Sequence, residues 1–131
     1  MSIKRSRLIL GALAVMMVPA VPAVAHHSFA MFDNTKTIIV SGKVKEFQFT
    51  NPHAWLLVTD SKGAVWSFEF GGGPSALIRA GINKSSLVAG EAVTVTAQPL
   101  RDGRKGGNLM LIEKSNGVEL SPRLGPPRAA K

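Results

Sequence analysis

The chain has 131 residues, contains neither cysteine nor tyrosine, and carries a formal net charge of +8. A chain of this length forms one small domain with a modest core, and the lack of cysteine excludes disulfide bonds and thiolate metal ligands. Much of the positive charge lies near the two ends of the chain, so the composition does not favour nucleic acid as a partner.

The first 25 residues have the pattern of a secretory signal peptide. A basic stretch precedes the apolar run 8–18, which as a helix would be about 16 Å long, too short for the roughly 30 Å core of a bilayer. Ala23 and Ala25 then make an A-x-A site, which predicts cleavage after Ala25, export to the periplasm, and a mature chain without a membrane span. An uncleaved N-terminal anchor is the alternative.

The rest of the chain is predicted to be one domain with an N-terminal arm and a tail. Phe29, Met31 and Phe32 predict that the arm lies on the domain, because burial of large apolar groups is favourable. From Ser121 onward, prolines and scattered positive charges are typical of a disordered tail. The predicted organisation is a signal peptide at 1–25, the domain with its arm at 26–120, and the tail at 121–131.

Alternating apolar and polar residues predict five strands, and Pro74 and Gly81 mark the two ends of a short helix. The apolar positions change parity between Val44 and Phe47, which predicts a bulge, with a bend at Gly42. The predicted strands are 37–49, 53–59, 64–70, 92–98 and 108–114, the helix is 74–80, and 99–107 is a glycine-rich loop. This order, β-β-β-α-β-β, predicts an all-β fold with a small helix insert, a five-stranded Greek-key barrel of the OB type; an open sandwich is the alternative.

The three histidines are the candidates for a metal site. Cleavage after Ala25 places His26 at the N-terminus, where its α-amino group and imidazole can chelate together, and His27 adds a third nitrogen. His53 is the one remaining imidazole, and an arm folded back over the barrel would bring it to the same site. Such nitrogen-rich sites suit Cu(II), Ni(II) or Zn(II), and we favour copper. The alternative is that all three histidines have only local structural roles.

Two carboxylates, Glu69 and Glu46, are candidates for an additional oxygen ligand. Glu69 lies between Phe68 and Phe70 in an alternating strand, and the alternative interpretation places it on a solvated face. Aromatic residues of the strands either stack a ligand or fill the core, and we expect at least four to be core. These aromatic residues are Phe47, Phe49, Trp55, Trp66, Phe68 and Phe70. The charged segment 101–105 is interpreted as a solvated hairpin loop.

Four motifs together resemble a family of small secreted bacterial proteins of unknown function. They are His26-His27-Ser28-Phe29-Ala30-Met31-Phe32-Asp33, Thr50-Asn51-Pro52-His53-Ala54-Trp55, Trp66-Ser67-Phe68-Glu69 and Pro99-Leu100-Arg101-Asp102-Gly103. The resemblance covers nearly the whole mature chain and implies a periplasmic location and a β-barrel-like domain, without an established activity. Because the motifs include the three histidines and Glu69, the resemblance also implies that these residues belong to one site.

Two classes of function follow from these residues. The first is a non-enzymatic periplasmic binding module whose ligand is a transition-metal ion. The alternative is an accessory subunit that docks on a larger periplasmic protein, in which the histidines bind no metal. A copper oxygenase that uses a terminal histidine is disfavoured, because the chain is short, has no tyrosine and shows no platform for a substrate. The sequence also contains no nucleophile–base pair and no phosphate-binding loop followed by a helix.

Overall fold

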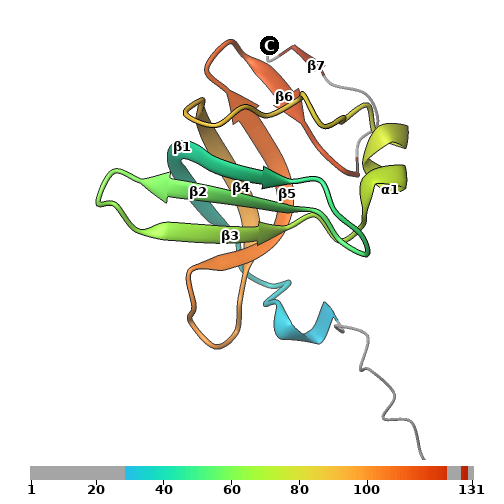
Figure 1. Ribbon diagram of the computed structural model, residues 1–131. Coiled ribbons are helices and arrows are strands. Elements are labelled where there is room, and N and C mark those ends of the chain that lie inside the picture. Colours follow the sequence, from blue (N-terminus) through green and yellow to red (C-terminus); the bar gives the residue numbers. More distant parts are fainter. Residues whose placement is uncertain (1–28, 124–127, 130–131) are drawn as a thin grey trace, which may run out of the picture.

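The computed structural model describes residues 29–123 and 128–129, which form a closed β-barrel (Figure 1). Its elements are η1 (Phe29–Met31), β1 (Ile38–Gln48), β2 (Trp55–Asp60), β3 (Val65–Glu69), α1 (Pro74–Arg79), β4 (Ala92–Pro99), β5 (Gly106–Lys114), β6 (Val118–Leu120) and β7 (Arg128–Ala129). The sheet order is β3-β2-β1-β4-β5-β6-β7, and a parallel pairing of β3 with β5 closes five of these strands into the barrel. The predicted all-β barrel of the OB type, with one short helix between β3 and β4, is confirmed.

The first strand is long enough to belong to both halves of the barrel. Its first half pairs with β4 and its second half pairs with β2, and the register with β2 shifts between Val44 and Glu46. The predicted bulge is therefore confirmed, and it turns Phe47 toward the core, as the change in parity required. At Gly42 the strands approach so closely that a Cβ atom would lie 2.3 Å from the Thr59 carbonyl oxygen, which explains the glycine at this bend.

The core fills the barrel and continues under α1. Phe68, Leu56 and Leu109 are fully buried inside, and Leu77 and Ile82 pack into the same cluster from the helical segment. Ile78, in contrast, is 60% exposed, because only one side of a six-residue helix faces the barrel. Of the six strand aromatics, Phe68 and Phe70 belong to the buried core, fewer than the four expected. Three more are partly buried and pack against this core: Phe47, Phe49 and Trp66.

Two parts of the C-terminal region differ from the prediction. The last barrel strand, β5, begins at Gly106, within the segment predicted to be a glycine-rich loop. Beyond it, β6 pairs with β5, and the backbone of β7 pairs with β6. In the segment 121–131, Ser121 is buried and donates a hydrogen bond to the Met110 carbonyl oxygen at 2.9 Å, so these described residues are held against the sheet, unlike the expected disordered tail. Residues 124–127 and 130–131 lie outside the described part.

Candidate functional site

His53 and Glu69 lie together where β2 begins and β3 ends. Trp55 is the register partner of Glu69, and two backbone hydrogen bonds extend this pairing: Phe70 N–H donates to the Ala54 carbonyl oxygen at 3.1 Å, and Ala54 N–H donates to that of Gly72 at 2.9 Å. This ladder brings His53, just before β2, beside β3. His53 Nδ1 contacts Glu69 Oε1 directly.

Glu69 is buried, with 3% of its surface exposed, so its interpretation as a solvated residue is wrong. The alternation along β3 correctly places Glu69 on the face opposite Phe68 and Phe70. At the C-terminal end of β3, however, that face is covered and not open to solvent. Glu69 lies between β2 and β5, with Trp55 and Asn108 as its register partners, and His53 contacts its carboxylate. A carboxylate buried in this way requires a hydrogen-bonding partner, and His53 provides it.

The contact determines which nitrogen of His53 remains free to bind a ligand. A carboxylate only accepts hydrogen bonds, so Nδ1 of His53 carries the proton and donates to Glu69. In a neutral ring with the proton on Nδ1, the lone pair lies on Nε2, and the side chain as a whole is 29% exposed. A histidine that binds a metal commonly donates a hydrogen bond from its other ring nitrogen to a carboxylate.

The other candidate ligands are not brought to this pair within the described residues. His26 and His27 lie outside that part of the chain. Glu46 is exposed and accepts a hydrogen bond from Gln48 Nε2 at 3.2 Å, so it is not a partner of His53. Among residues 29–123, no three histidine or acidic side chains are grouped as a metal site would require.

The arm is held against the loop between β4 and β5. Phe32 is buried and forms a β-bridge with Leu100, and Asp33 N–H donates to the Pro99 carbonyl oxygen at 2.8 Å. Arg101 then contributes two hydrogen bonds: its backbone N–H donates to the Met31 carbonyl oxygen and its Nε donates to the Ala30 carbonyl oxygen, each at 3.0 Å. The expectation that the arm lies on the domain is therefore confirmed through Phe32, whereas Phe29 is 64% exposed, so its expected burial is wrong.

Arg101 holds the arm, a role that the sequence interpretation missed, because the charged segment 101–105 was interpreted only as a solvated loop. The loop is exposed, but one of its arginines is used to hold the arm. The available signal was the motif Pro99-Leu100-Arg101-Asp102-Gly103, which belonged to the resemblance. Nearby, the pKa of Asp33 is lowered, chiefly because the Thr35 hydroxyl and backbone N–H donate to its carboxylate, and so Asp33 stays ionised beside Arg101 and Lys36.

We predict that replacing Arg101 with alanine loosens the arm. Losing the bond to the Ala30 carbonyl oxygen, about 1 kcal/mol, should raise amide exchange across residues 29–33 by about fivefold. Hydrogen–deuterium exchange with mass spectrometry measures this. Arg104→Ala is the matched control, because Arg104 lies in the same loop but pairs with Asp102 at 2.7 Å and not with the arm. Equal exchange in the two variants would contradict the assigned role of Arg101.

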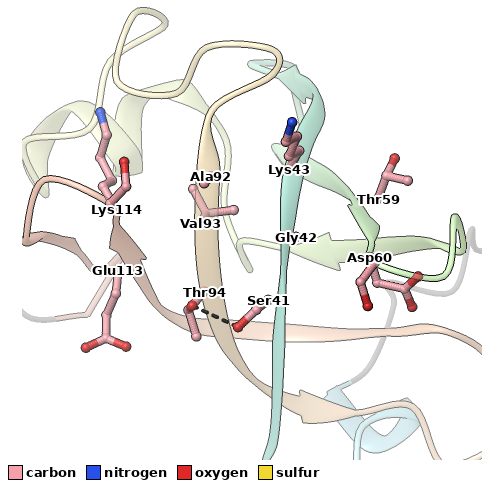
Figure 2. Close-up of a pocket in the computed structure, with 12 residues that line it drawn as sticks. Ser41, Gly42, Lys43, Thr59, Asp60, Ala92, Val93, Thr94, Glu113 and Lys114 are labelled. Atoms are coloured by element: carbon pink, nitrogen blue, oxygen red, sulfur yellow. Dashed lines mark hydrogen bonds between the residues drawn. The ribbon is translucent and has the colours of Figure 1, made fainter.

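A separate cavity of about 590 Å³ lies on the outer face of β1, β2, β4 and β5 (Figure 2). Small side chains are part of its lining: Ser41 and Thr94 are hydrogen bonded at 3.0 Å, and Gly42 has no side chain. Figure 2 shows the side chains of Lys43 and Glu113 pointing in opposite directions at its margins. This cavity shares no lining residue with the His53–Glu69 pair.

Two of the four charged side chains around this cavity, Asp60 and Lys114, have partners. Asp60 accepts a hydrogen bond from Trp66 Nε1 at 2.9 Å, and this bond, with those from the backbone of Ala64 and Lys62, lowers the pKa of Asp60. Lys114 forms a 2.9 Å ion pair with Glu91.

The barrel and the histidine–carboxylate pair define a small β-barrel protein with one oriented histidine at its surface. The chain belongs to the family of unknown function DUF6152, whose family model matches residues 14–109. This confirms the sequence-based assignment to a family without an established activity. No curated protein and no solved structure showed significant similarity to the chain. In the described region, the helix is too short and insufficiently apolar to cross a membrane.

Proposed function

We propose that this protein is an exported, non-enzymatic binding module for a transition-metal ion, with copper as the preferred metal. The observation that carries the proposal is the contact between His53 and Glu69, which fixes the imidazole and leaves Nε2 for a metal. In this proposal Glu69 orients the ligand His53 and increases its basicity, and any direct ligation by Glu69 is secondary. The export signal and the periplasmic location belong to the same proposal, because cleavage after Ala25 creates the free amine.

The position of the arm supports the participation of His26 and His27. The ring of Phe29 lies 3.6 Å from the point where a Cβ on Gly71 would stand, and Gly72 is hydrogen bonded to the residue that follows His53. His26 precedes Phe29 by only three residues, and an extended chain spans about 3.3–3.6 Å per residue. A terminal amine at His26 is therefore within roughly 10 Å of Phe29, a reach comparable to the width of two strands.

The donor set fits copper better than a hard cation. One amine and three imidazoles are nitrogen donors, and these lose their protons readily near neutral pH. Cu(II) and Zn(II) both accept such ligands, and Cu(II) is bound more tightly by a given nitrogen site. When bound, the metal would supply Lewis acidity at the end of the barrel, while the chain's own residues fix its position.

We predict that the mature protein binds Cu(II) and that three changes weaken binding. Removal of the ligand in His53→Ala and displacement of the amine by one extra residue before His26 should each lower affinity. Glu69→Gln should lower it by about tenfold, because the orienting carboxylate is lost. Calorimetric titration of a protein whose start at His26 has been verified by N-terminal sequencing measures all three. Glu46→Gln, a change in an exposed carboxylate, is the matched control. Equal affinity in all forms would reject the site.

The alternative function is an accessory subunit that docks on a larger periplasmic protein. The cavity of about 590 Å³ supports it, because this broad, partly polar hollow is independent of the histidines. Co-purification from the exporting cell separates the two functions. A stoichiometric metal favours the binding module, and a stoichiometric protein partner without metal favours docking.

A further inference from the structure

A second cavity, of about 180 Å³, lies between the arm, the segment after β3 and α1. Its walls are apolar: the rings of Phe29 and Phe70 and the buried side chain of Leu77 line it. None of its lining residues belongs to the metal site proposed above. The cavity is therefore separate from the proposed metal site.

One buried polar side chain lines this cavity. Asn108 is 1% exposed, and its Nδ2 donates to Gln98 Oε1 at 3.1 Å. Its side-chain oxygen lies 3.6 Å from the place where a Cβ on Gly71 would stand and has no hydrogen-bond partner among residues 29–123. The two amide atoms of an asparagine can exchange places if Gln98 also turns, so either the oxygen or the NH₂ group can face the cavity. The side-chain amide of Asn108 therefore has one polar atom at the cavity that can form a hydrogen bond with a ligand.

The remaining polar groups around the cavity favour an anion. Arg123 lies at its rim and forms no ion pair with any described residue. The backbone N–H groups of Gly71 and Gly72 likewise have no acceptor in the described part of the chain. Among the described residues, no acidic side chain lines the cavity. With Asn108 turned to present its NH₂ group, its side chain and the two glycine N–H groups are donors, and Arg123 is a cation.

We propose that this cavity binds a small carboxylate with a short aliphatic chain. The carboxylate would face Arg123, Asn108 and the glycine N–H groups, and the aliphatic chain would lie against Phe29, Phe70 and Leu77. A dry cavity of about 150 Å³ accommodates benzene, so about 180 Å³ holds six or seven non-hydrogen atoms. Butyrate and pentanoate have these sizes. Because the arm supplies one wall, the ligand would also hold the arm on the barrel.

The proposal is tested with metal-free mature protein, so that its outcome does not depend on copper binding. Titration with acetate, propionate, butyrate, pentanoate and hexanoate, followed by calorimetry, should show affinity rising about fourfold per methylene. The rise should stop near pentanoate, where the cavity is full. Butylammonium, which has a similar chain and the opposite charge, should not bind. Equal binding of butyrate and butylammonium, or no binding of any carboxylate, would overturn the proposal.

Two pairs of variants locate the binding. Ala76→Leu fills the cavity from the exposed side of α1 and should abolish butyrate binding, whereas Ser75→Leu, its exposed neighbour outside the lining, should not. Arg123→Ala should weaken binding by about tenfold through loss of a charged hydrogen bond, and Arg79→Ala, another exposed arginine, is its control. All four positions lie outside the barrel core, so folding is preserved. Unchanged binding in Ala76→Leu would show that the ligand lies elsewhere.

Discussion

Replacing His53 with alanine is expected to lower the free energy of unfolding by about 3 kcal/mol. The reason is the carboxylate left behind: Glu69 is 3% exposed, and among the described residues His53 is the side chain that contacts its carboxylate. The value lies at the lower end for broken buried pairs, because His53 is itself 29% exposed and water can enter in its place. Urea unfolding followed by far-ultraviolet circular dichroism measures the change.

A double-mutant cycle distinguishes this explanation from simple loss of packing. Glu69→Gln alone should cost about 1 kcal/mol, because a neutral amide still accepts from Nδ1 of His53. In the His53→Ala variant, Glu69→Gln should raise the free energy of unfolding, because no buried charge then remains. Strictly additive losses in the double variant would show that the pair is not coupled. This stability cycle needs no metal, so it stands apart from the copper titration.

Replacing Gly106 with alanine is expected to open the barrel. A Cβ at Gly106 would lie 2.3 Å from the Ser67 carbonyl oxygen, a separation that no real contact reaches. Because the obstructing atom belongs to the backbone, β3 and β5 must move apart, and they are the two strands whose parallel pairing closes the barrel. We expect a loss of about 3 kcal/mol, the upper part of the usual range for overpacking. Urea unfolding measures it, and hydrogen exchange at Ser67, whose N–H donates to Lys105, locates it.

Gly103→Ala serves as the control for this effect. Gly103 lies in the same connection at a φ of +79°, and a Cβ there would meet nothing within 4 Å. Its substitution therefore introduces only the strain of a left-handed conformation, about 1–2 kcal/mol. It should leave the exchange of Ser67 unchanged. If Gly103→Ala raised hydrogen exchange at Ser67 as much as Gly106→Ala does, the close approach of β3 and β5 would not be the cause of the opening.

The parts of the fold that follow from periodicity were predictable. Strand parity revealed the bulge between Val44 and Phe47, and the pair Pro74 and Gly81 located the helix. The start of β5 was missed, because glycine is typical of turns and also of close backbone approach, and the sequence does not distinguish the two. The strand β6 was missed because three residues are too few for an alternating pattern.

The candidate site was predictable only in its residue types. Histidine and glutamate were selected for their chemistry, but the burial of Glu69 depends on β2 and β5 lying on either side of it. Which nitrogen of His53 is held depends on the same neighbours. The role of Arg101 depends on a contact between residues at opposite ends of the sequence, which no local pattern encodes. The two histidines predicted at the start of the mature chain lie outside the described residues.

The arm contact also affects the order in which the site assembles. His53 and Glu69 are sixteen residues apart and meet when one hairpin forms, whereas Ala30 and Arg101 are separated by 71 positions. Closing the longer loop costs roughly 1.3 kcal/mol more chain entropy, and it also requires the β4–β5 connection to be in place. The oriented histidine can therefore form early in folding, and the arm docks after the barrel has closed. In the proposed metal site, a ligand carried by that arm would therefore reach the barrel after His53 and Glu69 have met.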